Sequence, residues 1–281
     1  GQVAGRTAEV QRPPRAARDA RDEVVTVPLL TFPGLARVPG LRHGVTTREG
    51  GVSGGSWRSL NLGRSTGDLP DAVTENGRRV GEAIGAARVR FPRQVHGAAV
   101  RIVTSSDAGP VGEADALATG EAGVALGVLG ADCPGVVIAD PVRRALAVVH
   151  SGWRGTVAGV VPAAVGVLVE RFGSRPADLV AGVGPGISAR SYEVGPEVAD
   201  ALRTRIPGGD RCVVKGRGDR AYVDLALAIR AQLEALGVRS SAIEAMELCT
   251  FEATELLFSH RRDGAGAGRH GLVAMWTSAS G

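Results

Sequence analysis

Three apolar runs of β-strand type follow one another closely near the middle of this 281-residue chain. They are GVALGVL (123–129), GVVIAD (135–140) and RALAVVH (144–150), and the connections between them are too short to hold a helical crossover. Strands joined so closely pair antiparallel, so we expect a three-stranded meander. In its second hairpin, Cys133 before one strand and His150 at the end of the next should fall at the same edge of the sheet.

Three longer segments carry apolar residues at helical spacing and end near a glycine, which is typical of a helix C-terminus. They are residues 71–85, 156–173 and 222–238. Further β-type runs lie at 24–30, 43–48, 98–104, 178–184 and 271–276. This pattern indicates the α/β or α+β class, with a mixed sheet flanked by helices. No linker divides the chain after residue 25, so we expect a single compact catalytic domain over residues 26–281.

Residues 1–25 are polar and rich in arginine, and they lack the apolar stretch of a secretory signal. We expect them to form a disordered tail. Hydrophobic residues make up 44% of the chain and charged residues 22%, which suits a globular protein with a substantial core. The chain has no apolar run of about 18 residues, so the sequence predicts no membrane-spanning helix.

The charge pattern and the cysteines narrow the partners and the compartment. The net charge of +4 comes from scattered arginines rather than from a basic run with interleaved aromatics, so we expect no nucleic-acid partner. Cys133, Cys212 and Cys249 form an odd set without a CxxC pair, which argues against a disulfide framework. Free thiols favour a reducing compartment, so we expect a cytoplasmic protein. We expect a monomer as the favoured oligomeric state.

Two histidines and one cysteine have the setting of a metal site. His96 lies in RQVHGAAV before a strand, and His150 closes ALAVVH before the turn SGWRG. Cys133 lies in LGADCPGVV, between an acid and a proline rather than inside an apolar run. A thiolate and two imidazoles suit zinc, and three protein ligands leave a fourth position open. The spacing leaves two interpretations open, because a Cys/His nucleophile pair would use the same residues.

Several short motifs occur along residues 43–276, in this order: TTREGGVS, SLNLG, QVHG, ADC, HSGWRG, GPGI followed by YEVG, DLALAIRAQLEALGV, CTF, and FSHRRDG with a later GR. This series resembles the YfiH/DUF152 family, also described as laccase-like multicopper polyphenol oxidoreductases and as peptidoglycan-editing factor PgeF. The resemblance implies a compact α/β fold and zinc bound by His96, Cys133 and His150. It also implies purine nucleoside phosphorylase and adenosine deaminase activities.

If the resemblance holds, the partners are phosphate and a purine nucleoside such as inosine, adenosine or methylthioadenosine. A phosphorylase needs an anion-binding group, and Arg48 in a glycine-rich turn could grip two phosphate oxygens. Cys133 and His150 are the candidate catalytic pair. Asp132, next to Cys133 in the sequence, is the nearest candidate to accept or return a proton or to orient a ligand. Asn61 and Tyr192 are candidates for hydrogen bonds to the substrate, and a turn-stabilising role is equally open for both.

Copper is the less favoured metal, because five histidines and two methionines are too few for a multicopper site. Two other functions stay open. Cys133 and His150 could hydrolyse an amide bond in the editing of peptidoglycan precursors, or the metal could stabilise a binding module. The motifs depart from the usual family pattern in ADCPGVV, in HSGWRG and at His260 of FSHRRDG. These departures leave the ligands unchanged and bear on the preferred substrate.

Overall fold

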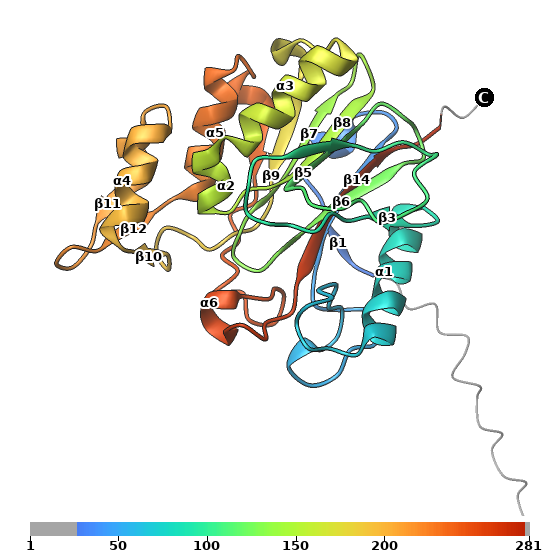
Figure 1. Cartoon of the computed structure of the whole chain (residues 1–281), viewed down its shortest axis with the longest axis horizontal. Helices are drawn as coiled ribbons and strands as arrows, with labels where there is room; N and C mark the ends of the chain where they lie inside the picture. Colours follow the sequence, from blue (N-terminus) through green and yellow to red (C-terminus); the bar gives the residue numbers. More distant parts are fainter. Residues whose placement is uncertain (1–26, 279–281) are drawn as a thin grey trace, which may run out of the picture.

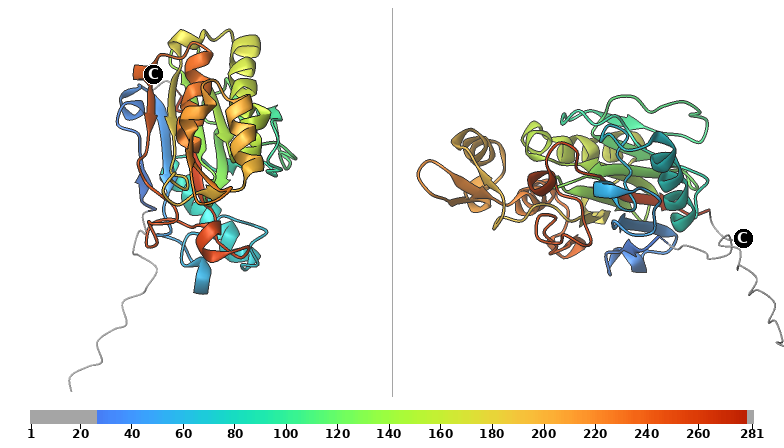
Figure 2. Two further views of the ribbon diagram at one scale, coloured as in Figure 1. Left: turned by 90° about the vertical axis from the view of Figure 1, so that its left-hand side faces the viewer. Right: turned by 90° about the horizontal axis from the view of Figure 1, so that it is seen from below.

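Two β-sheets lie face to face with helices on both outer sides in the computed structural model, which describes residues 27–278 (Figures 1 and 2). The layers run from α1 (Pro70–Ile84) through a five-stranded and a six-stranded sheet to α3 (Val160–Phe172) and α5 (Leu225–Ala235). The N-terminal tail expected over residues 1–25 lies outside the described residues. None of the helices over 27–278 combines the length and the apolar character that a membrane span requires.

Both sheets mix parallel and antiparallel pairs, which confirms the fold class expected from the sequence. The five-stranded sheet has the order β1 (Leu29–Leu30), β2 (Leu41–Thr46), β14 (His270–Trp276), β6 (Ala125–Gly130), β3 (Val89–Arg90). The six-stranded sheet has the order β13 (Ile243–Ala245), β9 (Val180–Val183), β7 (Gly135–Asp140), β8 (Ala145–His150), β5 (Ala116–Thr119), β4 (Val100–Ile102).

Strand β8 explains why the central runs are apolar throughout rather than alternating. All of its residues are buried. Leu146 and Val148 pack into the core between the two sheets, whereas Ala147 and Val149 pack into the core under α3 and α5. Successive side chains of a strand point to opposite faces, so a strand covered on both faces is apolar at every position.

The expected three-stranded meander is correct for one pair and wrong for the other. Strands β7 and β8 pair antiparallel, with Gly135 opposite His150. Strand β6 instead lies in the other sheet, between β14 and β3. The connection between β6 and β7 crosses from one sheet to the other, with Asp132 in the left-handed region (φ 89°). A short connection therefore excludes a helical crossover but does not require that its two strands pair.

The helix expected over 156–173 is two helices, α2 (Trp153–Ala158) and α3, separated by Gly159. Gly159 has φ 83°, which breaks the helical path and which glycine adopts without steric cost. Pro162 falls in the first turn of α3, where its missing N–H has no intrahelical partner to lose. The helix expected over 222–238 begins later, at Leu225, because Asp224 caps it by accepting from the N–H of Leu227.

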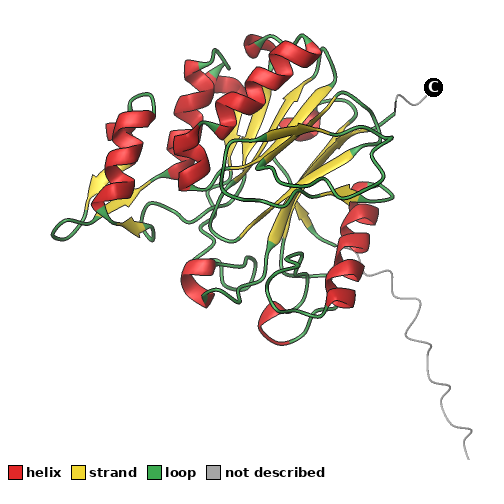
Figure 3. Ribbon diagram, viewed as in Figure 1, coloured by secondary structure: helices red, strands yellow, loops and turns green. Residues whose placement is uncertain are grey.

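An extension at one end of the molecule was not predicted from the sequence (Figure 3). It consists of α4 (Pro196–Arg205) and the small sheet β10 (Glu193–Val194), β12 (Ala221–Val223), β11 (Val213–Lys215). Its apolar side chains join those of α5 in a separate cluster, with Trp153 packed against it. Strands of two or three residues are too short to show a period in the sequence. The last helix, α6 (His260–Asp263), lies near the five-stranded sheet.

Candidate metal centre

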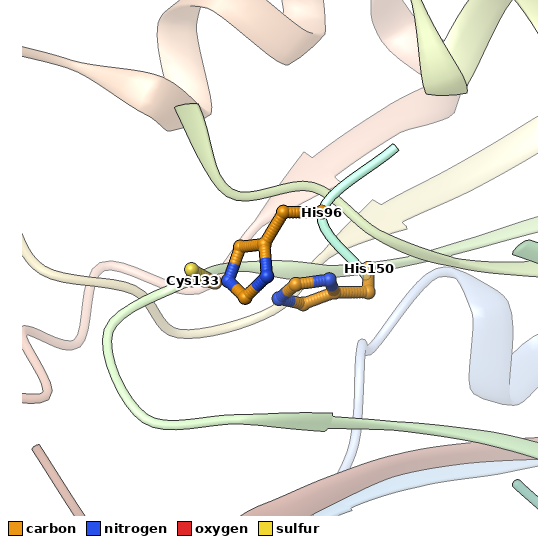
Figure 4. A group of neighbouring side chains, drawn as sticks. All are labelled: His96, Cys133 and His150. Atoms are coloured by element: carbon orange, nitrogen blue, oxygen red, sulfur yellow. The ribbon is translucent and has the colours of Figure 1, made fainter. Parts of the chain in front are cut away.

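His96, Cys133 and His150 meet at one end of the β7–β8 hairpin, although they come from three separate segments (Figure 4). His96 lies between β3 and β4, Cys133 in the connection from β6 to β7, and His150 at the end of β8. One potential ligand atom from each residue lies within 4.8 Å of the others. The pairing of Gly135 with His150 brings Cys133 beside His150, as the hairpin spacing predicts. The two imidazole rings lie edge to face, with centroids 4.8 Å apart.

Asp115 fixes the orientation of His150 and was missed in the sequence. This fully buried residue stands just before β5, and its Oδ1 lies 2.8 Å from Nδ1 of His150. Nδ1 therefore donates to the carboxylate, and Nε2 is the nitrogen left for a ligand. The signal in the sequence was an acidic residue at the start of an apolar strand, in GEADALATG. Without knowledge that β5 lies beside β8, nothing distinguished this aspartate from a surface residue.

Asp115 also holds the loop that carries His96. Its carboxylate accepts hydrogen bonds from the backbone N–H groups of Val95 at 3.2 Å, His96 at 3.0 Å and Gly97 at 2.7 Å. His96 itself adopts φ 61°, an uncommon conformation for a residue with a side chain. Such strained backbone persists where surrounding contacts hold it, and it is frequent at functional sites. One buried carboxylate thus places both imidazoles.

The charges in the cluster favour a thiolate next to an imidazolium when no metal is present. Burial alone would raise the pKa of the Cys133 thiol, but hydrogen bonds from His150 and His96 outweigh it and lower that pKa. Burial alone would lower the pKa of His150, but Asp115 and Cys133 outweigh it and raise that pKa. A deprotonated thiol is the form that binds a metal, so Cys133 needs no further deprotonation near neutral pH, whereas His150 must lose a proton when a metal binds.

The backbone of Gly152 closes one side of the cluster. A Cβ atom placed there would lie 2.5 Å from Sγ of Cys133 and 3.4 Å from Cδ2 of His96. A real Cβ does not tolerate the first separation unless its neighbours move, whereas the second is ordinary van der Waals contact. The glycine in SGWRG is therefore required for close approach of the chain to the thiol.

The donor set fits zinc. Sulfur and two imidazole nitrogens are ligands that zinc prefers, and three ligands leave one position open. Within residues 27–278 this is the one group of three or more histidine, cysteine or acidic side chains close enough to share an ion. Met246 and Met275, the two methionines of the chain, pack in apolar clusters of the core. An axial methionine, which is typical of copper electron-transfer sites, therefore has no counterpart in the described part of the chain.

Arg48 and Asn61 have contacts that stabilise the loop in which they lie. The guanidinium of Arg48 donates to the carbonyl oxygens of Arg58, Thr254 and Ser56 at 2.9–3.2 Å, and it lies over the ring of Phe258. Asn61 is fully buried, and both its side-chain amide nitrogen and its oxygen are hydrogen-bonded within the protein. These contacts account for both residues structurally, and substrate contact by either one stays a prediction.

Asp132 and Tyr192 lie closer to the cluster. The carboxylate of Asp132 accepts from Oγ1 of Thr250 and from the backbone N–H of Arg261, both at 2.6 Å, which fixes the turn before Cys133. Burial, together with the negative charge of nearby Cys133, raises the pKa of Tyr192 to about 12. The phenol therefore stays protonated and can donate a hydrogen bond. The guanidinium of Arg261 lies 5.2 Å from the centroid of the Tyr192 ring.

Two further residues near the site were also missed. Arg269 stands just before β14, and His270 pairs in that strand with Gly130, close to Cys133 in the chain. Burial lowers the pKa of His270 to about 4, so this imidazole is neutral at neutral pH. Arg269 is half-buried and lies near both Cys133 and Asp132, whose charges favour its protonated form. Both residues belong to the GR motif and its neighbour, but the motif alone suggested no role.

Comparison with known proteins shows that this chain belongs to one family. The model of the family described as multi-copper polyphenol oxidoreductase laccase matches residues 42–277. A purine nucleoside phosphorylase of Streptomyces coelicolor is 42% identical over 229 residues, which cover 80% of this chain and 92% of the relative. A purine nucleoside phosphorylase of Deinococcus radiodurans is 40% identical over 252 residues, which cover 89% and 91%.

Solved structures have the same fold. YlmD from Geobacillus stearothermophilus is similar with a TM-score of 0.82 and 34% identity, over 86% of this chain and 93% of that protein. The hypothetical protein YfiH of Bacillus licheniformis is similar with a TM-score of 0.81 and 29% identity, over 84% and 93%. The layered architecture therefore recurs in proteins of related sequence.

Proposed function

Because the chain belongs to the family described as multi-copper polyphenol oxidoreductase laccase, and curated relatives bear the name purine nucleoside phosphorylase, we propose that it is a zinc-dependent purine nucleoside phosphorylase. Membership confirms the family that the motifs suggested. The observation that carries the proposal is the cluster of His96, Cys133 and His150, with His150 oriented by Asp115. Inosine and adenosine are the proposed nucleosides, with methylthioadenosine as a further candidate.

His96, Cys133 and the Nε2 atom of His150 would hold the zinc. Zinc supplies Lewis acidity, which polarises groups close to it and lowers the pKa of water. Asp115 keeps the proton of His150 on Nδ1, which fixes the tautomer and makes the other nitrogen a better donor. Cys133 stays deprotonated because the two imidazoles stabilise its negative charge. The thiolate is thus ready to bind the metal, whereas the Nε2 proton of His150 would be released when the zinc binds.

Phosphorolysis breaks the bond between C1′ of the ribose and a purine nitrogen while a phosphate oxygen bonds to C1′. Negative charge then develops on the departing purine, which must be stabilised by a hydrogen-bond donor. Tyr192 fits that role, because its phenol keeps its proton and lies near Cys133. Asp132 fits the role of an orienting group, because its carboxylate is already held by Thr250 and Arg261.

We propose adenosine deamination as a second reaction of the same site. Deamination replaces the exocyclic amino group of adenosine by oxygen from water and releases ammonia, and it uses no phosphate. It requires a proton donor for the leaving ammonia, and the Tyr192 phenol, which keeps its proton beside the cluster, fits that role. The free cysteines, one of them a proposed zinc ligand, suit a reducing compartment, so we propose the cytoplasm as the location.

The experiment that tests the function follows the products from inosine with and without phosphate. The proposal predicts that hypoxanthine and ribose 1-phosphate appear in equal amounts, and that hypoxanthine release stops when phosphate is replaced by sulfate. With adenosine and no phosphate, inosine and ammonia should form. Hypoxanthine release that is independent of phosphate would indicate a hydrolase instead, and no release from any purine nucleoside would refute the proposal.

A further inference from the structure

Arg48 in the motif TTREGGVS and Arg269 in the later GR differ in how many hydrogen-bond donors they keep free. Arg48 uses Nε, Nη1 and Nη2, each on a different backbone carbonyl. Arg269 uses Nη1 alone, which donates to the carbonyls of Ala267 and Gly268. Over residues 27–278, Nε and Nη2 of Arg269 have no hydrogen-bond partner, and neither is fully enclosed. Arg269 therefore keeps one edge of its guanidinium for a ligand, whereas Arg48 does not.

Arg269 also lies next to the metal centre. Its neighbour His270 is paired with Gly130, the last residue of β6, and the chain continues from there to Cys133. The charges of Cys133 and Asp132 reach the Arg269 guanidinium and raise its pKa, against a larger lowering by burial. A half-buried arginine without a fixed carboxylate partner retains positive charge that a bound anion can neutralise.

Hydrogen bonds on both sides hold the backbone of Arg269. Its N–H donates to Oδ1 of Asn61 at 2.9 Å, and its carbonyl accepts from the N–H of Leu62 at 3.0 Å. Asn61 is held in turn by Thr66 and by the backbone of Gly63. Gly63 leaves room for the side chain, since a Cβ there would lie 2.8 Å from Cγ of Arg269. A preorganised arginine loses little entropy when it binds a ligand.

We propose that Arg269 binds the phosphate of the phosphorolysis reaction, with its Nε and Nη2 edge on two phosphate oxygens. The inference rests on the proposed function for the identity of the anion. It also gives Asn61 a positioning role, since Asn61 holds the backbone of Arg269 rather than the substrate. A planar guanidinium matches two oxygens of one phosphate, which a lysine ammonium does not.

Direct binding of inorganic phosphate to the zinc-loaded protein tests the inference without a turnover assay. Titration calorimetry at constant ionic strength measures the affinity in wild type, Arg269→Gln, Arg269→Lys and Arg175→Gln. Arg175 is an exposed arginine paired with Asp178 and controls for the loss of one positive charge. We expect Arg269→Gln to weaken phosphate binding by about tenfold or more, Arg269→Lys to recover part of the loss, and Arg175→Gln to match wild type.

Kinetics separate this inference from the proposed function. The KM for phosphate in inosine cleavage should rise by about tenfold or more in Arg269→Gln, while the rate of phosphate-independent adenosine deamination changes much less. Wild-type affinity for phosphate in a folded, zinc-loaded Arg269→Gln protein would overturn the inference and leave the phosphorylase intact. Absence of phosphate binding in wild type would also overturn it. Arg269-dependent phosphate binding without inosine cleavage would support the anion site and refute the proposed function.

Discussion

Oδ1 of Asp115 lies 2.8 Å from Nδ1 of His150, and the exposed fractions of the two side chains are 0% and 4%. The same carboxylate accepts the backbone N–H groups of Val95, His96 and Gly97. One buried acid therefore orients one proposed ligand and anchors the loop of another. A pair of this kind behind a metal-binding histidine raises the basicity of the ligand and fixes its ring.

Asp115→Asn should weaken zinc binding by about 10- to 100-fold, because the amide lacks the charge that holds the His150 proton on Nδ1. Competition against a chromophoric chelator measures the affinity. Asp178→Asn, which removes an acid near the surface at the other end of an ion pair with Arg175, should leave it unchanged. Equal zinc affinity in Asp115→Asn and wild type would show that the carboxylate has no influence on the metal.

Gly152→Ala should displace Cys133 and lower the zinc content, since its Cβ would lie 2.5 Å from the thiol sulfur. Gly166→Ala provides the matched control, because Gly166 lies within α3 and a Cβ there meets no atom within 4 Å. We expect that control to keep full zinc and to gain up to about 1 kcal/mol of stability from helix propensity. Elemental analysis and thermal unfolding give both quantities. Full zinc occupancy in Gly152→Ala contradicts the packing argument.

Arg48→Gln should reduce the free energy of unfolding by about 2 kcal/mol, because three backbone carbonyls lose a charged donor. The KM for phosphate should stay within about twofold of wild type. Urea denaturation and steady-state kinetics on one preparation separate the two effects. The opposite result, normal stability with a KM raised about tenfold, would restore Arg48 as the phosphate ligand that its motif suggests.

Because His270 is buried, we expect the free energy of unfolding to fall in mild acid. Its pKa is about 4 in the folded protein and 6.5 in an exposed reference, so both states are neutral above pH 6.5. As the pH falls from 6.5 to 4, the unfolded chain takes up a proton that the folded protein does not. The free energy of unfolding should fall by up to about 3 kcal/mol over that window.

His270→Gln should flatten that pH dependence, and substitution of the exposed His260 by Gln should not. Denaturant unfolding at half-unit pH steps measures the slope of each protein. An unchanged slope in His270→Gln would mean that this imidazole is already charged in the folded state or that other groups cause the loss.

The sequence predicted those parts of the fold that depend on local pattern. Apolar period and glycine positions located α1, α5 and the pair β7 and β8, and the hairpin spacing placed Cys133 beside His150. The same reasoning assigned β6 to the wrong sheet, because a buried strand has the same apolar sequence pattern in either of the two sheets. Strands of two or three residues in the extension carried no periodic signal at all.

The site residues show the same division. The three proposed ligands stood out by residue type and motif, whereas the roles of Asp115 and Arg269 depend on contacts across more than 30 residues of sequence. Conversely, Arg48 and Asn61 lie in conspicuous motifs, yet the described contacts are those of a supporting loop. The structure adds the contacts of each residue, and kinetics of the variants test which residues contact the substrate.

Zinc titration of the metal-free protein tests the central claim most directly. Inosine phosphorolysis is measured after each addition of zinc to the wild type, to Cys133→Ala and to Cys212→Ala, which alters a cysteine buried in the extension. The account predicts that activity rises linearly to a break at about one zinc per chain in wild type and Cys212→Ala, and stays at background in Cys133→Ala. Full phosphorolysis by the metal-free protein, or by Cys133→Ala, would contradict it.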